Sequence, residues 1–304
     1  MTRKIEIAGL GFGSMDYLCI VPHIPVDEKV GAIERLIQGG GAAATATVAA
    51  SRLGAKTAFI GTVGDDSEGK QIINDFYKEK VGIRYIQQKT GKSSPVAYCW
   101  VEQESGKRSI VWSKGTSMPL DAEAIDTDFI SSLKLLHLDG HNTEAAIKAA
   151  EIAKANRIII SLDAGSLLPG IDRLVELSDI CIASEFFARA YTGEEDIEKA
   201  IKKLFTPGKF IVAATMGDKG VIAMTTEGFI RKGAFKVPVT DTTGAGDVFH
   251  GAFAYAYIQG WSVDKCLDFA SATAAIKCTA FGGRTGIPGQ NEVFKFLKER
   301  GILI

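Results

Sequence analysis

The residues best suited to chemistry form one short run, Asp241–Asp247, which reads Asp-Thr-Thr-Gly-Ala-Gly-Asp and leads into a predicted helix at Gly246–Gln259. Small residues let the backbone approach a ligand, and free N–H groups at a helix N-terminus bind an anion without any basic side chain. Asp247 would stand beside that anion site. A carboxylate that faces a hydroxyl there is the minimum needed to transfer a phosphoryl group to an alcohol. The alternative is an ordinary acidic residue at a helix start.

Two other glycine-rich runs fall short of known nucleotide motifs. Gly9–Ser14 follows a predicted strand, but its third glycine comes one position too early for a dinucleotide fingerprint and no helix follows. Gly64–Lys70 has the spacing of a P-loop up to its lysine, but Gln71 stands where a Ser or Thr should reach Mg²⁺. Its acidic residues and Ser67 are more typical of a helix N-terminus.

The elements that must position the run alternate along the chain. Short apolar runs separated by amphipathic ones predict an α/β fold with a mainly parallel sheet, on which ligands bind beyond the carboxyl ends of the strands. The predicted strands are Ile5–Leu10, Thr57–Thr62, Leu135–Leu138, Ile158–Leu162, Ile180–Ala183, Phe210–Thr215 and Val221–Thr225. The other predicted helices are Ala42–Leu53, Ser67–Lys80, Thr143–Ala155, Ile171–Leu177, Asp196–Leu204 and Ser262–Thr279.

Two segments, about 14–38 and 94–113, break this alternation because they are extended and contain no helix. The second one contains two alternating runs around a Glu-Ser-Gly-Lys turn at 104–107, which predicts a hairpin. We expect both segments to form a small β lid that excludes water from a reacting centre. A plain extension of a sheet edge is the alternative.

Composition limits the class of protein. The 304 residues carry 35 basic and 36 acidic side chains, and this balance argues against a nucleic-acid binder that relies on a broad cationic field. No window reaches 18 uninterrupted apolar residues and Glu6 interrupts any leader-like stretch, so we expect a cytoplasmic protein without a membrane span. Five scattered cysteines predict reduced thiols, and metal binding by His137 and His141 competes with their being a strand end and a loop.

At this point the chain resembles the ribokinase-like (PfkB) carbohydrate kinases over nearly its whole length. Asp241–Asp247 matches the family's C-terminal signature, and Gly39–Gly41 with the small-residue helix that ends at Ala55 is similar to its N-terminal signature. Val63–Gly69 is similar to a further family segment, which explains the false P-loop, and Thr215–Gly220 resembles the loop that borders the nucleotide. The resemblance implies a ribokinase-like three-layer sandwich, with 1–304 as one kinase domain.

The resemblance also implies roles. Asp247 would be the base, and the amides of Gly244, Ala245 and Gly246 would stabilise the transferring phosphoryl group. Mg²⁺ would accompany ATP, and a monovalent cation such as K⁺ would sit near Asp241 and Thr243, held largely by carbonyls after residue 278. The sugar would be bound by Asp16, Gly40, Gly41 and Thr45. ATP would be bound by Thr215, Gly217, Gly220, Thr243, Gly244, Gly246, Lys277 and Gly283.

Two positions depart from the family pattern. Thr45 stands where many members carry an asparagine, and the family's Asn-x-x-Glu element reads Ser184–Phe187 here, without its final carboxylate. Three runs resemble most the branch that contains the 6-deoxy-6-sulfofructose kinases, with ketohexokinases as more distant relatives: Phe249–Ala252, Lys277–Thr279 and Gly282–Pro288. The lid and the 108–141 region match that branch less well. A homodimer through the lid is a further candidate.

The predicted activity is ATP-dependent phosphorylation of a primary hydroxyl of a ketose or ketose derivative. A nucleoside kinase, with a base stacked on Tyr98, Trp100 or Trp112, and a non-catalytic sugar-binding regulator are the alternatives. Several other side chains could reach a phosphate or an acidic sugar, or line the pocket, and solvated positions are the alternative for them. These side chains are Arg284, Arg108, Lys29 and His141.

Overall fold

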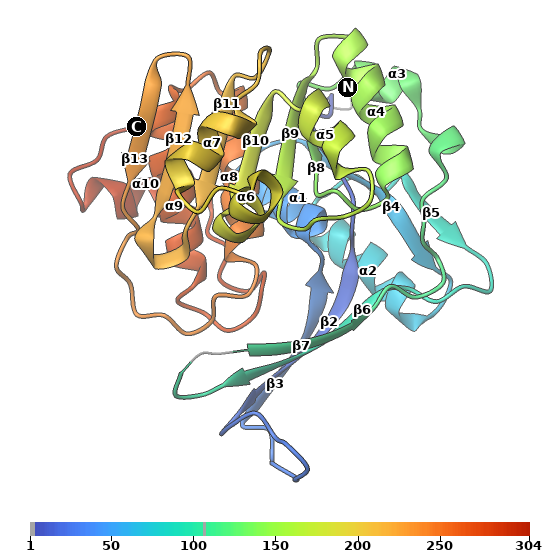
Figure 1. The fold of residues 1–304 in the computed structure, drawn as a ribbon. Coiled ribbons are helices and arrows are strands. Elements are labelled where there is room, and N and C mark those ends of the chain that lie inside the picture. Colours follow the sequence, from blue (N-terminus) through green and yellow to red (C-terminus); the bar gives the residue numbers. More distant parts are fainter. Residues whose placement is uncertain (1–3, 106–107) are drawn as a thin grey trace.

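A nine-stranded, mainly parallel sheet forms the centre of the molecule in the computed structural model, which describes residues 4–105 and 108–304 (Figure 1). Only the pairs β11–β12 and β12–β13 at one edge are antiparallel. Strands such as β8 and β10 are buried on both faces, which suits continuous apolar runs in a parallel sheet. In spatial order the strands are β13 (Gly228–Lys232), β12 (Val221–Thr225), β11 (Ile211–Thr215), β10 (Ile180–Ser184), β9 (Ile159–Ala164), β8 (Leu135–Leu138), β1 (Ile7–Leu10), β4 (Thr57–Gly64) and β5 (Ile86–Lys89).

Helices cover both faces of this sheet, so the molecule has the expected three layers. Leu136 and Leu138 of β8 pack into one apolar cluster and Leu135 into another, because successive side chains of a strand point to opposite faces. The first cluster includes residues of α3 (Thr127–Ser131), α4 (Thr143–Ala155), α5 (Ile171–Leu177), α6 (Glu185–Thr192) and α7 (Ile197–Leu204). The second includes residues of α1 (Ala42–Arg52), α8 (Ala245–Ile258), α9 (Val263–Lys277) and α10 (Gln290–Lys298).

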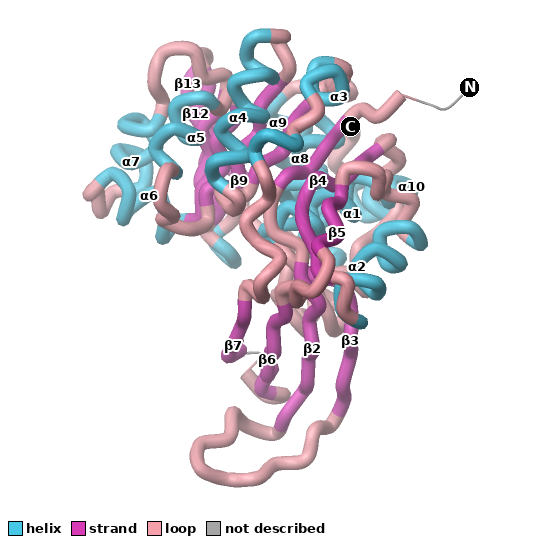
Figure 2. Tube along the Cα trace, turned by 90° about the vertical axis from the view of Figure 1, so that its right-hand side faces the viewer, coloured by secondary structure: helices cyan, strands magenta, loops and turns pink. Residues whose placement is uncertain are grey.

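A second sheet of four strands projects from the body, and Figure 2 shows it below the central sheet. Its order is β3 (Glu34–Gly40), β2 (Ser14–Val21), β6 (Val96–Glu102) and β7 (Arg108–Ser113). This sheet is the predicted lid, and its bounds agree closely with segments 14–38 and 94–113. The hairpin between β6 and β7 is confirmed, although Gly106 and Lys107 of its turn lie outside the described residues. Helix α2 (Ser67–Lys78) packs between the lid and β4.

The predicted elements are all present, with ends that differ by a few residues. Two helices were not predicted although their sequences carry local signals. Ser184 caps α6 by accepting a hydrogen bond from the Phe187 N–H at 3.1 Å, and α10 buries Val293 and Leu297 at helical spacing. The short edge strands β5 and β13 and the helix α3 were also missed, as were the 3₁₀ turns η1 (Ala122–Ala124) and η2 (Gly217–Lys219). None of the missed elements carries a predicted site residue except the turn at Gly217.

Candidate active site

The Asp241–Asp247 run forms the turn that starts α8, as its small residues predict. Gly244 is the N-cap with φ of 73°, and a Cβ on it would lie 2.9 Å from the Gly283 carbonyl oxygen, so only glycine fits. The Ala245 N–H donates to the Thr242 carbonyl at 3.2 Å. The N–H groups of Gly244, Gly246 and Asp247 have no hydrogen-bond partner among the described residues. They are the donors that this helix end offers to an anion.

Asp247 is half-buried in the first turn of α8, and its carboxylate accepts no hydrogen bond from the residues that the structure describes. Burial raises the pKa of Asp247 to about 7. The carboxylate of Asp163 contributes to this rise in pKa, whereas the imidazole of His250 opposes it. A carboxylate with a pKa near neutrality is suited to take a proton from an alcohol at physiological pH.

The groups beneath Asp247 form a buried ion pair. His250, one helical turn along α8, places its Nε2 at 3.2 Å from Oδ1 of Asp163, at the carboxyl end of β9. Burial alone would lower the pKa of His250, but Asp163 raises it above its usual value. Burial alone would raise the pKa of Asp163, but His250 holds it below its usual value. The His137 ring lies 5.6 Å from the His250 ring, and burial lowers its pKa to about 3, which keeps it neutral.

The predicted sugar residues converge where the lid meets α1. Asp16 of β2 accepts a hydrogen bond from Ser14 Oγ at 2.6 Å, and its carboxylate packs so closely on Gly40 that a Cβ there would collide with it. Burial raises the pKa of Asp16, which the Ser14 bond and the charge of Arg284 oppose. Thr45 lies in α1, buried, and its Oγ1 accepts from Arg284 Nε at 3.2 Å.

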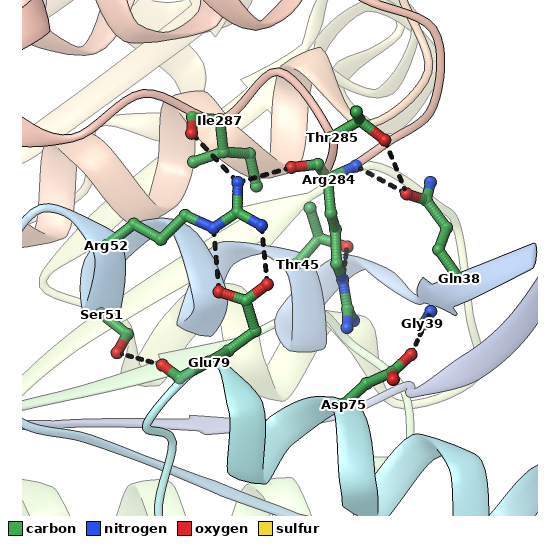
Figure 3. A network of polar contacts seen from close by, with 10 residues as sticks. All are labelled: Gln38, Gly39, Thr45, Ser51, Arg52, Asp75, Glu79, Arg284, Thr285 and Ile287. Carbon is green, nitrogen blue, oxygen red and sulfur yellow. Dashed lines mark hydrogen bonds and ion pairs between the residues drawn. The ribbon is translucent and has the colours of Figure 1, made fainter.

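Arg284 is buried at the centre of the polar network in Figure 3. Its Nη2 donates to the Gly40 carbonyl at 2.9 Å, and its guanidinium lies 5.5 Å from the Phe76 ring centroid. Burial lowers the pKa of Arg284 to about 10, so the group stays charged at neutral pH. Its donors therefore bind the predicted sugar residues themselves. The alternative of a solvated loop position is wrong for Arg284, and its contact with a phosphate or an acidic sugar stays a prediction.

Arg52 holds the outer side of the same network (Figure 3). It forms a bidentate pair with Glu79 at 2.8 and 2.6 Å, and its Nη1 donates to the carbonyls of Arg284 and Ile287. The Asp75 carboxylate accepts the Gly39 N–H at 3.1 Å. At the other end of the network, Thr285 Oγ1 donates to Gln38 Oε1 at 3.4 Å. These contacts fix the backbone around Gly40 and Arg284 through side chains that do not reach the sugar residues.

Asp139, at the carboxyl end of β8, joins the two parts of the sugar side. Its carboxylate accepts the N–H of Phe12 at 2.8 Å, of Ala43 at 3.0 Å and of His141 at 3.0 Å. Ala43 belongs to the first turn of α1, so this carboxylate also satisfies a helix N-terminus. The sequence interpretation did not assign a role to Asp139, and its amide partners could not be read from local spacing.

Three of the predicted nucleotide residues lie at the end of β11, beside the end of β10. Thr215 ends β11 in register with Ser184, which ends β10, and Thr215 Oγ1 donates to the Ala183 carbonyl at 3.3 Å. Gly217 and Gly220 follow in a tight turn with φ of 60° and 93°. Glu185 of the Ser184–Phe187 element pairs with Arg189 at 2.8 Å. Phe187, at the position where the family has a carboxylate, is fully buried in the core.

Asp241 and Lys277 support the start of the Asp241–Asp247 turn. The Asp241 carboxylate accepts the N–H of Thr243 at 2.8 Å and of Gly282 at 2.9 Å. Burial alone would raise the pKa of Asp241, but these hydrogen bonds and the charge of Lys277 lower it. Lys277 is fully buried, and its Nζ donates to the Asp241 main-chain oxygen at 2.8 Å. The ammonium thus contacts the turn itself, not an open surface where ATP would lie.

The inner face of the lid contacts the Asp241–Asp247 turn. Asp16 shares a row with Ala97 and Trp112 in the register of the lid, and the Trp112 ring lies 5.8 Å from that of Phe12. Arg108 of β7 donates to Thr242 Oγ1 at 2.7 Å. Other predicted residues lie away from this face. Tyr98 stacks on Tyr17 on the opposite face of the lid, and Trp100, two residues along the same strand, belongs to that face as well. Lys29 is exposed in the β2–β3 loop. The His141 ring contacts that of Phe12 at 4.9 Å in a tilted arrangement, and His137 faces His250 instead.

The chain is similar to known carbohydrate kinases over nearly its whole length. A family model described as "pfkB family carbohydrate kinase" matches residues 14–290. The chain is 32% identical over 305 residues to the ribokinase of Haemophilus influenzae, covering 95% of this chain and 97% of that protein. It is 27% identical over 320 residues to a 5-dehydro-2-deoxygluconokinase of Clostridium perfringens, covering 98% and 94%. The solved structure of Arabidopsis thaliana ribokinase, complexed with ribose and ATP, matches with a TM-score of 0.85 and 25% identity, over 97% of this chain and 99% of that one.

Two further observations concern the whole described chain. Among residues 4–105 and 108–304, no helix combines the length and the apolar character needed to cross a membrane. All five cysteines are free thiols, as their scattered positions predict.

Proposed function

The chain belongs to the pfkB family of carbohydrate kinases, and on that premise we propose that it transfers the γ-phosphoryl group of ATP to a primary hydroxyl of a ketose or ketose derivative. The observation that carries this proposal is one helical turn of α8. There Asp247, whose pKa burial raises to about 7, stands beside the unpartnered N–H of Gly246. Base and anion donor share one rigid element, so both meet a substrate in fixed geometry.

The reaction then follows from these two groups. Asp247 takes the proton of the sugar hydroxyl while the hydroxyl oxygen attacks the γ-phosphorus of ATP. The bond between the γ-phosphorus and the bridging β-phosphate oxygen breaks, and ADP leaves. A positioned base contributes roughly 10²–10⁴-fold and each anion-hole donor roughly 3 kcal/mol. We propose the amides of Gly244 and Gly246 as the main donors. The Ala245 amide, which the sequence also predicts, must first leave the Thr242 carbonyl that it contacts here.

Substrate binding is proposed on the two sides of that turn. On the lid side Asp16 offers a carboxylate to sugar hydroxyls, while Gly40 and Gly41 allow close backbone approach and Thr45 offers its hydroxyl. On the other side ATP would lie over the ends of β10 and β11. We propose Thr215, Gly217, Gly220, Thr243 and Gly283 as its neighbours. Lys277 would act on ATP only through the loop that it supports.

Mg²⁺ supplies charge neutralisation at the phosphates when it is bound. The residues at the Ser184–Phe187 element do not fit a direct ligand role, because Phe187 is buried in the core and Arg189 holds Glu185 at 2.8 Å. We therefore propose that the ion enters on the phosphates of ATP and keeps several waters, as Mg²⁺ commonly does.

The test is a panel of acceptors assayed with MgATP by ADP release. The panel contains ribose, ketohexoses, 6-deoxy-6-sulfofructose, a keto-deoxy sugar acid, inosine and adenosine. Turnover of a ketose that exceeds turnover of the others supports the proposal. Turnover of a nucleoside alone, or sugar and ATP binding without ADP formation, contradicts it. Turnover of ribose alone, or of the sugar acid alone, would support the sugar kinase activity but contradict the proposal that its substrate is a ketose.

The lid offers a surface for a homodimer, and we propose that two copies pack through it. In its register Ile37, Tyr17, Tyr98 and Val111 form one row on the face opposite Asp16, and all but Tyr17 are at least 46% exposed. A row of this kind is typical of an interaction surface. Val111→Glu should shift the mass in sedimentation toward the monomer, whereas Lys114→Glu, just beyond β7, should not. If the wild type itself sedimented with the mass of a monomer, the proposed homodimer would be wrong.

A further inference from the structure

A buried cation from a neighbouring helix contacts the Asp241–Asp247 turn. Lys277 is the last residue of α9, and none of its surface is exposed to solvent. A charged ammonium in such a place must have acceptors, because an unpaired buried charge is strongly unfavourable. Its acceptor is the main-chain oxygen of Asp241, at 2.8 Å, and Asp241 is the first residue of the turn that leads to Asp247.

Most of the oxygens expected to hold K⁺ already accept hydrogen bonds, although Thr243 Oγ1 is buried without a partner among the described residues. Both carboxylate oxygens of Asp241 accept backbone N–H groups, from Thr243 and Gly282. The Cys278 carbonyl accepts the N–H groups of Thr240 and Asp241 at 2.8 and 3.2 Å. The Asp241 carbonyl accepts Lys277. Each of these oxygens keeps a further lone pair, but an alkali cation bound among them would stand beside the Lys277 charge, and the two like charges would repel each other at close range. The site therefore disfavours a bound alkali cation while Lys277 occupies it.

We propose that the Lys277 ammonium takes the place of a monovalent cation in this enzyme: it holds the 241–244 turn through the Asp241 carbonyl, and the kinase needs no K⁺. An ammonium carries the same single positive charge as K⁺ and is a compact, directional donor. It adds to the positive end of α8 and favours an anion at Gly244 and Gly246. Lys277 is thus a positioning residue, since it touches the turn and not the substrate. The inference rests on the proposed kinase activity and deepens it.

Charged groups of the Asp241–Asp247 turn and of the lid act on Lys277. Asp241 and Asp247 favour the charged ammonium, and Arg108 of the lid disfavours it. Burial lowers the pKa of Lys277, which the nearby carboxylates oppose. The two acidic residues belong to the catalytic turn, so removing the ammonium leaves their charge without its counter-ion.

The experiment compares cations at constant ionic strength, about 0.1 M. Wild-type initial rates with MgATP and the accepted sugar should agree within about twofold between tetramethylammonium and K⁺. Lys277→Met should lose about tenfold or more in kcat without K⁺, as expected when an anion site is disturbed, and should regain part of it in K⁺ or NH₄⁺. Melting curves without substrates give a second readout: K⁺ should raise the Tm of Lys277→Met and leave that of the wild type unchanged.

Lys209→Met is the matched control. Lys209 is also buried and donates to carbonyls, those of Val175 and Ser178, but it lies on the opposite side of the sheet from α8. It should lose stability without any specific effect of K⁺. A wild type that K⁺ activates tenfold or more, about 1.4 kcal/mol, overturns the inference even if no variant folds. So does a Lys277→Met enzyme that is active and indifferent to K⁺. Absence of turnover with every sugar would instead refute the proposed function, and the melting curves would still test Lys277.

Discussion

The imidazole of His250 and the carboxylate of Asp163 lie 3.2 Å apart beneath the catalytic turn, one from α8 and the other from the end of β9. The pKa of His250 is raised and that of Asp163 is lowered, so each stabilises the charge of the other. The pair adds no net charge, but its two members act on Asp247 in opposite directions. The pKa of Asp247, the proposed base, therefore depends on the charges of both Asp163 and His250.

Neutralising either member should move the acid limb of the kcat/KM profile. Asp163→Asn removes the charge that raises the pKa of Asp247, so the limb should shift to lower pH. His250→Gln removes the opposing charge, so the limb should shift to higher pH. We expect shifts of about half to one pH unit. His137→Gln is the control: it lies against His250 but is neutral, and it should leave the limb in place. Shifts in the same direction for the first two variants would contradict the ion-pair argument.

The wild-type profile itself carries a signed prediction. Because burial raises the pKa of Asp247 to about 7, kcat/KM should fall as the pH drops through that value, as the base becomes protonated. Stability has the opposite sign. A raised carboxyl pKa favours the folded state below the usual pKa, and this contribution disappears as the pH rises through about 7. Activity and Tm measured over the same pH range should therefore diverge. An acid limb near the usual carboxyl pKa would exclude Asp247 as the group that controls it.

Asp247→Asn separates catalysis from binding. Loss of the base should nearly abolish turnover, and sugar affinity should stay within a few-fold because the carboxamide keeps the shape of the site. The variant should also gain roughly 1–2 kcal/mol of stability above pH 7, since it no longer buries a charge there. Single-turnover ADP release and sugar titration by calorimetry measure the two effects. If more than about a tenth of the wild-type turnover remained, Asp247 would not be the base.

Gly244→Ala tests the fit of the anion-binding turn, and Gly193→Ala is its control. Both glycines have φ of 73°, so each alanine should cost about 1 kcal/mol in stability. Only at Gly244 does the new Cβ meet another atom, the Gly283 carbonyl at 2.9 Å, whereas nothing lies within 4 Å at Gly193. We expect Gly244→Ala alone to lose kcat, by about tenfold or more. Equal kcat in the two variants would show that the turn tolerates displacement.

Arg284→Lys tests the support of the sugar side. A lysine cannot bond the Gly40 carbonyl and Thr45 together as the guanidinium does, so the sugar KM should rise by about tenfold with little change in kcat. Arg52→Lys, in the same network but paired with Glu79, should lower Tm and leave KM unchanged. A lower kcat at constant KM in Arg284→Lys would place its effect on the chemical step instead.

The parts of the fold that were predicted are those whose signals are local. Apolar runs such as Leu135–Leu138 and Val221–Thr225 predicted strands with the observed ends, and Thr143–Ala155 predicted its helix in the same way. The glycines and Asp247 predicted the turn because a helix start needs no distant partner. The family resemblance supplied the grouping of the lid and Asp16 with that turn.

The remainder depends on contacts between distant segments. Asp139 bonds Phe12 across 127 positions, and nothing near either residue indicates this contact. Arg284 looked like a loop arginine between glycines, yet its bond to Gly40 spans 244 positions and buries it. The pairing of His250 with Asp163 likewise needs the register of β9 against α8. Tertiary packing sets these groups, so local spacing could not predict them.

The bond between Arg108 and Thr242, at 2.7 Å, joins a lid strand to the turn that would handle phosphate. A change in the lid that admits a new acceptor must therefore preserve or replace this contact. Substitutions in the lid that change which sugar is accepted would then also change the rate of phosphoryl transfer. A lineage adapting to a different sugar would have to pass through substitutions that alter both, which narrows the routes open to it.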